Sequence, residues 1–121
     1  MGAEIILEIT DTDGDIVQQL TNIVGAEHVL TSDEDRQFFS MDVMWEGLPP
    51  LAIIQPANAK DVAAIIRLCV ENGLAVTPRG GGLSYTKGYV PQNERTVTLD
   101  LRRLNRIVEI NIADMYITAQ A

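Results

Sequence analysis

The sequence predicts an α+β fold in which a strand–helix–strand unit is followed by several short strands. Residues 50–78 indicate the unit, because the short apolar runs Leu51–Gln55 and Leu74–Thr77 flank an amphipathic helical pattern. Alternating apolar residues beyond Pro91 indicate the later strands. A crossover between two parallel strands of one sheet is nearly always right-handed, so we expect that hand here.

The helix of this unit is predicted to begin after Asn58, a good N-cap residue, with Asp61 at its third position. Apolar residues recur at i, i+3, i+4, i+7 and i+8, and charged residues occupy the other face. The apolar positions are Val62, Ile65, Ile66, Cys69 and Val70, and the charged ones are Lys60, Arg67 and Glu71. Asn72 and Gly73 are expected to end the helix.

Two short helices are predicted upstream of the unit. The first covers Asp13–Val24, where apolar residues have helical spacing, and Gly25 follows where a left-handed cap would fall. Thr31 and Glu34 have the spacing of a capping box, which predicts a second helix through Phe39. Bulky apolar residues gather near its end and are interpreted as core or interface filler: Phe38, Phe39, Met41, Met44 and Trp45.

The last third of the chain is predicted to contain three strands. Thr96–Leu101 alternates enough to form one strand, and a tight turn is expected between it and the next. Arg106–Ile110 and Met115–Gln120 predict two more strands, joined by Asn111–Asp114 as a hairpin loop. The alternation is still running at Ala121, so we expect the domain to be truncated there.

Composition indicates a soluble globular domain and excludes some classes of partner. The 121 residues carry a net charge of −8, which argues against nucleic acid because duplex binding needs basic side chains to neutralise phosphates. No apolar run approaches the roughly 20 residues of a membrane span, and Met1–Thr10 lacks the pattern of a signal peptide. We therefore expect no membrane span and a cytoplasmic location.

Cysteine and histidine each occur once, which limits the chemistry of the chain. Cys69 cannot form an internal disulfide and falls on the apolar face of a predicted helix, so we expect it in the core. His28 is isolated, so the sequence predicts neither a zinc site nor a Ser–His–Asp arrangement. We expect His28 at the surface or at an interface.

A glycine-rich stretch directly follows the second strand of the unit: Pro78-Arg79-Gly80-Gly81-Gly82-Leu83-Ser84-Tyr85-Thr86-Lys87-Gly88. Three consecutive glycines allow positive φ, so successive backbone N–H groups can turn inward around a phosphate or pyrophosphate. Arg79 and Lys87 would add positive charge at the rim, and the hydroxyls of Ser84 and Thr86 could donate further hydrogen bonds. Loops at the carboxyl ends of strands in open sheets are favoured ligand sites.

This stretch differs from two common phosphate-binding motifs. The dinucleotide fingerprint needs a glycine three positions after the second one, and the Walker pattern ends in Gly-Lys-Ser/Thr. The residues alone therefore predict a ligand that bears phosphate, at a site of neither kind. A surface turn without a ligand stays open as an alternative, because glycine-rich turns are common.

Several spaced motifs resemble, in order, the FAD-binding domain of the vanillyl-alcohol oxidase superfamily, the PCMH-type domain. The glycolate oxidase and D-lactate dehydrogenase type of FAD-linked oxidase is the most similar. The motifs are Gln55-Pro56, Lys60–Ile66, Val76–Gly82, Val97–Leu101 and Leu104–Ile107. The resemblance covers residues 49–121, which we expect to be the N-terminal portion of that domain, with residues 1–48 as a variable helical lead-in.

The resemblance implies that backbone N–H groups of the loop from Arg79 to Ser84 bind the FAD pyrophosphate, and that Pro56 and the strand end near Pro78 shape the site. The cofactor-binding residues it implies are Pro78, Arg79, Gly80, Gly81, Gly82, Leu83, Ser84 and Tyr85. Some relatives have a histidine at the position of Leu83 that is bonded covalently to the flavin, so the FAD here is expected to be non-covalent. Catalytic residues are expected beyond residue 121.

The implied activity is the oxidation of a small 2-hydroxy acid or alcohol, with FAD as the hydride acceptor. Two alternatives stay open: a reductase resembling UDP-N-acetylmuramate dehydrogenase, and a non-catalytic binding or assembly module. The chain by itself is expected to be inactive and to bind FAD weakly or not at all, because the flavin and adenine rings would lack apolar walls. Met115–Ala121 is predicted to offer an exposed edge that pairs with another copy of the chain.

Overall fold

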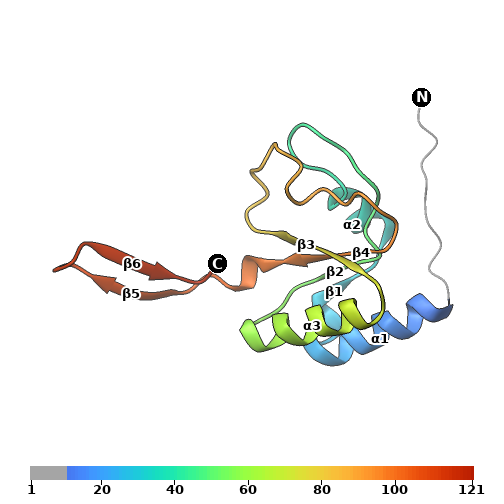
Figure 1. The fold of residues 1–121 in the computed structure, drawn as a ribbon, viewed down its shortest axis with the longest axis horizontal. Coiled ribbons are helices and arrows are strands. Elements are labelled where there is room, and N and C mark those ends of the chain that lie inside the picture. The colour runs from blue at the N-terminus through green and yellow to red at the C-terminus, as the bar shows by residue number, and fades with distance from the viewer. Residues whose placement is uncertain (1–10) are drawn as a thin grey trace.

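The structure is a computed structural model that describes residues 11–121; Met1–Thr10, with the first part of the predicted lead-in, lies outside the described residues. Figure 1 shows a body of helices packed on a sheet and a two-stranded hairpin that extends away from it. Helices and strands are mixed along the chain, which confirms the predicted α+β fold.

The body is built on a four-stranded sheet in the order β1-β2-β4-β3. Its strands are β1 (Val29–Leu30), β2 (Ala52–Ile54), β3 (Ala75–Arg79) and β4 (Thr96–Asp100). The strands β2, β4 and β3 are parallel, and the short β1 pairs antiparallel with β2. The predicted strand–helix–strand unit is present as β2, α3 (Ala59–Glu71) and β3, but β4 lies between its two strands.

The core lies between the sheet and two helices, α1 (Asp11–Val24) and α3, which lie side by side below the strands in Figure 1. Ile16 and Leu20 of α1 and Ile65 of α3 belong to one buried cluster with the strand residues. Cys69 is also fully buried there, as predicted, and its burial raises the pKa of the thiol to about 11. The upstream helix α1 therefore shares its core with the later sheet.

Local hydrogen bonds set both ends of α3. Asn58 Oδ1 accepts from the Asp61 N–H at 2.9 Å, and Asp61 Oδ2 accepts from the Ala57 N–H at 3.0 Å. The helix ends at Glu71, with Asn72 as its C-cap, and Gly73 follows with φ of 67°. The predicted start and end of this helix are confirmed.

The caps of the two upstream helices differ from the predictions. The second helix, α2 (Asp33–Phe38), is capped by Ser32, whose Oγ accepts from the Asp35 N–H at 3.1 Å, so the predicted capping box at Thr31 is wrong. Three acidic residues in the first turn of α2 favour this start because they complement the helix dipole. Gly25 has a positive φ of 90°, but its ψ of 151° lies outside the left-handed helical region expected of the predicted cap.

The strand β3 continues through Pro78 and Arg79, beyond the predicted end at Thr77. Proline is accepted here because β3 is an edge strand, where a missing N–H can face away from the ladder. Pro78 still pairs in register with Leu99 of β4. The extension places Arg79 at the carboxyl end of the strand, opposite Asp100.

The hairpin consists of β5 (Ile107–Asn111) and β6 (Tyr116–Ala119), joined to the body by a 3₁₀ turn over Leu101–Arg103. Both the turn and the hairpin were predicted and are confirmed. The Asn111 side chain accepts from the Asp114 N–H at 2.9 Å and tightens the hairpin loop. Almost every residue of both strands is exposed.

Candidate functional site

The glycine loop, residues 80–88, leaves the sheet at the carboxyl end of β3. It begins the connection from β3 to β4, at the edge of the sheet. In Figure 1 this connection lies beside the segment that joins α2 to β2. Two backbone–backbone hydrogen bonds join the two segments, from the Val43 N–H to the Ser84 carbonyl and from the Leu48 N–H to the Pro91 carbonyl.

The three glycines have different structural roles. Gly82 has φ of 76°, and a Cβ there would lie 2.8 Å from Nη2 of Arg79. Gly80 and Gly81 do not have positive φ, and a Cβ at either would meet no atom within 4 Å. The predicted positive φ therefore holds for Gly82 alone. The folding of the chain does not require a missing side chain at Gly80 or Gly81, so their open space is available to a ligand that approaches the backbone.

Arg79 does not lie at the rim of the loop, so that prediction is wrong. Arg79 is only 9% exposed. Its guanidinium carbon lies 4.8 Å from the ring centres of Phe39 and Tyr89 and 5.1 Å from the ring centre of Phe38. Nη1 donates to the Met41 carbonyl at 3.2 Å. Attraction between the cation and three ring faces holds this charge beneath the loop.

The other predicted polar groups are at the surface. Lys87 is exposed, as expected for a rim charge, and its Nζ lies 4.0 Å from the ring centre of Trp45. The hydroxyls of Ser84 and Thr86 lie 3.1 Å apart, and Ser84 Oγ accepts from the Thr86 N–H. Both hydroxyls therefore lie on the same turn of the loop.

The remaining predicted site residues are largely exposed, and Pro56 is the exception. Leu83 is 83% exposed and Tyr85 is 66% exposed, whereas Pro56 is fully buried. Pro78 is exposed on the edge strand. The structure thus brings Gly80–Tyr85 together on one surface, with Arg79 packed behind them.

Asp42 is a residue of this region that sequence reasoning missed. Its Oδ1 accepts from the Met44 N–H at 2.8 Å and the Trp45 N–H at 2.7 Å, and its Oδ2 accepts from the Lys87 N–H at 2.9 Å. Desolvation raises the pKa of the carboxyl, but these backbone donors and the charge of Lys87 together lower it below its usual value. An aspartate that caps its own turn is a common pattern. The third donor, 45 residues away, leaves no local signal.

The apolar residues of the segment around Asp42 do not all lie in the core, and an interface role for the exposed ones stays a prediction. Phe39 is buried, but Phe38, Met44 and Trp45 are 57%, 68% and 48% exposed. Gly47 packs tightly on the later connection, since a Cβ there would lie 2.2 Å from the Pro91 carbonyl oxygen. The segment therefore lies directly against the residues that follow the glycine loop.

A buried carboxylate fixes the same end of the sheet. Asp100 is 1% exposed, and its carboxylate accepts from Arg102 at 2.7 Å and from Gln55 at 2.9 Å. Burial raises the pKa of Asp100, but the bonds from Arg102 and Gln55 hold it below its usual value. His28 is half-buried, with Nδ1 3.5 Å from the Gln55 side-chain oxygen. These contacts tie the ends of β2 and β4 together.

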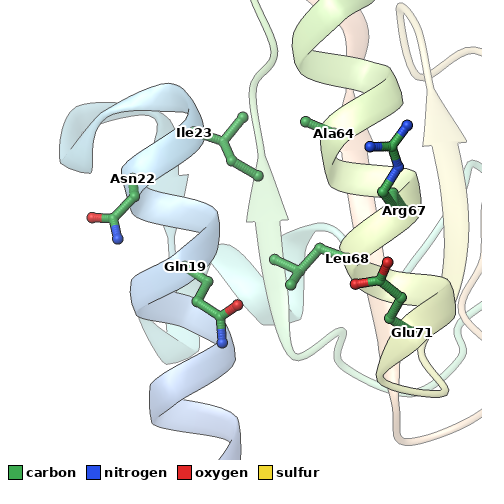
Figure 2. Close-up of a pocket in the computed structure, with 7 residues that line it drawn as sticks. All are labelled: Gln19, Asn22, Ile23, Ala64, Arg67, Leu68 and Glu71. Carbon is green, nitrogen blue, oxygen red and sulfur yellow. The ribbon is translucent and has the colours of Figure 1, made fainter.

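A separate groove of about 360 Å³ lies between α1 and α3 (Figure 2). Its lining residues are Gln19, Asn22, Ile23, Ala64, Arg67, Leu68 and Glu71. The groove belongs to the helical layer and includes no residue of the glycine loop.

Within residues 11–121 no cluster of histidine, cysteine or carboxylate side chains could hold a metal ion. No helix in that range is long and apolar enough to cross a membrane.

Sequence comparison identifies relatives of this chain. The family model described as "FAD binding domain" matches residues 50–121. The glycolate oxidase subunit GlcD of Bacillus subtilis is 29% identical over 108 residues, which cover 88% of this chain and 23% of that protein. The D-2-hydroxyglutarate dehydrogenase of Xanthomonas citri is 32% identical over 106 residues, 87% of this chain and 22% of that protein. The chain thus spans about a fifth of the length of these relatives.

Solved structures have the same fold. A p-cresol methylhydroxylase matches with a TM-score of 0.70 and 21% identity, over 85% of this chain and 21% of that one. An alkyldihydroxyacetonephosphate synthase matches with a TM-score of 0.75 and 17% identity, over 88% of this chain and 22% of that one. The fold predicted from the resemblance is therefore confirmed. Because the family match covers more than half of the residues, the chain belongs to the FAD binding domain family, and FAD is its cofactor.

Proposed function

We propose that residues 78–85 bind the pyrophosphate of FAD without a covalent bond. The observation that carries this proposal is a run of free backbone donors. Among the hydrogen bonds of the described residues, none is donated by a backbone N–H of Gly81–Tyr85. Five successive N–H groups on one exposed turn can surround an anion, as in the backbone nests that bind phosphate.

The open space at Gly80 and Gly81 supports the same assignment. A pyrophosphate must approach the backbone closely to accept its N–H groups, and a side chain at either position would stand in the way. Lys87 adds a positive charge at the surface of the loop, which favours a dianionic group. Leu83 offers no nucleophile to the flavin, so the proposed binding is non-covalent.

Gly81→Val tests the loop. A valine Cβ at this position meets no atom of the chain, so the variant should fold normally and lose flavin. Flavin content is read from the visible spectrum of the purified full-length protein and of the supernatant after acid precipitation. Gly14→Val is a matched control, because Gly14 also has open space around its Cβ position and lies in α1. Equal flavin content in wild type and Gly81→Val would overturn the assignment.

We further propose that the full-length protein oxidises a small 2-hydroxy acid or a similar alcohol. This rests on relatives that include a glycolate oxidase subunit, a D-2-hydroxyglutarate dehydrogenase and a quinone-dependent D-lactate dehydrogenase. When bound, FAD supplies the hydride acceptor. Anaerobic bleaching of the flavin band by glycolate, D-lactate or D-2-hydroxyglutarate would support the proposal. A flavin that none of the three bleaches, but that a phenolic alcohol does, would contradict it.

A further inference from the structure

Residues 38–46, which we term the bracket, hold both ends of the glycine loop. The bracket precedes the residues that the family model matches, 50–121. It contacts the start of the loop through Arg79, whose guanidinium packs on the rings of Phe38 and Phe39 and donates to the Met41 carbonyl. The same guanidinium lies beside Gly82, where it leaves no room for a Cβ.

The bracket contacts the end of the loop through Asp42. Lys87 has φ of 64°, a left-handed conformation that residues with a Cβ rarely adopt. Its N–H donates to Asp42 Oδ2, and its ammonium group lies over the Trp45 ring on the same segment. The Val43 N–H donates to the Ser84 carbonyl at 3.4 Å and adds a third point of attachment. Both ends of a glycine-rich turn are therefore anchored to one short segment.

We propose that the bracket pre-organises the glycine loop for its ligand, and that Asp42 and Arg79 are positioning residues in this role. The inference rests on the proposed binding of pyrophosphate by the loop. A run of glycines loses more conformational freedom on ordering than any other sequence. Anchoring both ends before the ligand arrives removes part of that entropic cost from the binding step.

The two oxygens of Asp42 allow a sharp test. Oδ1 accepts both bonds of the local turn, and Oδ2 accepts only the Lys87 N–H. In Asp42→Asn, the amide oxygen can keep the local turn, while the amide NH₂ faces the Lys87 N–H and cannot accept from it. This variant therefore removes the bond to the loop and leaves the bracket's own turn intact.

We expect Asp42→Asn to weaken FAD binding about tenfold in the full-length apoprotein, the effect of losing one charge-assisted hydrogen bond. Hydrogen exchange of the Lys87 amide should be faster, and the NMR signals of Gly81–Ser84 should shift. Asn93→Ala is a matched control, because Asn93 Oδ1 also accepts two bonds, from Arg95 and Thr96, at the start of β4. It should lower stability without changing FAD affinity or the loop signals.

Three outcomes separate this inference from the proposed function. Unchanged loop signals and unchanged FAD affinity in Asp42→Asn would overturn the role of the bracket, as would equal losses of affinity in Asp42→Asn and Asn93→Ala. A wild-type protein that binds no FAD, with loop signals that still respond to Asp42→Asn, would overturn the pyrophosphate assignment and leave the bracket's control of the loop supported. If Asp42→Asn fails to fold, Arg79→Lys tests the other anchor, since lysine keeps the charge but cannot stack a planar group on the rings.

Discussion

The body of the molecule and the β5–β6 hairpin use the same apolar residue types and bury them very differently. In the body, Ile16 and Ile65 are at most 2% exposed and share one core. In the hairpin, Ile110 and Ile117 are 61% and 64% exposed. The hairpin is therefore held by its own ladder and loop, whereas the body is held by packing between its layers.

This difference shows that the apolar pattern of the hairpin does not serve a core within the described residues. An isolated two-stranded hairpin is marginally stable in water, and exposed apolar patches of this kind mark contact surfaces. Pairing of β6 with another copy of the chain stays a prediction. Matched substitutions in the body and in the β5–β6 hairpin test this difference in burial.

Truncation of a buried apolar residue is expected to have the largest effect on the free energy of unfolding. Ile65→Ala should lower the free energy of unfolding by about 2–5 kcal/mol, because it leaves a cavity between α3 and the sheet. Ile110→Ala removes the same atoms from an exposed strand and should change it by less than about 0.5 kcal/mol. Urea denaturation followed by circular dichroism measures both. Similar losses in the two variants would show that the hairpin is packed in solution.

Substitution of the buried carboxylate of Asp100 should have an intermediate effect on the free energy of unfolding. Asp100→Asn should lower the free energy of unfolding by about 1.5–3 kcal/mol at neutral pH, because it breaks the ion pair with Arg102. The pKa of Asp100 is lowered in the folded state, so its contribution is present above the pKa of an unfolded aspartate and is lost as pH falls through the folded value. Denaturation midpoints in acid should therefore fall more steeply for wild type than for Asp100→Asn. Parallel curves of midpoint against pH for wild type and Asp100→Asn would contradict this expectation. Substitution of the exposed hairpin residue Glu109, Glu109→Gln, is the control.

The smallest effect concerns two asparagines that accept similar backbone hydrogen bonds. Asn58→Ala removes the cap of α3 and should lower global stability by about 1 kcal/mol. Asn111→Ala removes the bond that tightens the hairpin loop and should speed amide exchange in β5 and β6 without changing the melting temperature of the body. A lower melting temperature in Asn111→Ala would mean that the hairpin and the body unfold together.

The sequence predicted those elements whose causes are local. The ends of α3 were predictable because Asn58, Asp61 and Gly73 act on neighbouring residues. The order of the strands was not, because the place of β4 depends on pairing between segments far apart in the chain. Capping of α2 was misread because Thr31 and Ser32 are both good N-cap residues, and only the backbone conformation selects Ser32.

In the candidate site, too, features with local causes could be predicted and features that depend on distant segments could not. The glycine loop is visible in the sequence because three adjacent glycines are a local signal. The direction of Arg79 and the role of Asp42 depend on contacts between segments 38 and 45 residues apart, so no local pattern reveals them. The charge of Arg79 is visible in the sequence, but the three aromatic rings that surround its guanidinium are not.

The position of β4 between β2 and β3 also imposes an order on folding during synthesis. β2 and β3 pair with β4 and not with each other, so neither can complete its ladder until Thr96–Asp100 has left the ribosome. The connection that carries the glycine loop is closed by that same strand. A nascent chain therefore closes the loop when β4 joins the sheet, and a chain stalled before residue 96 would expose the edges of β2 and β3 that β4 normally covers.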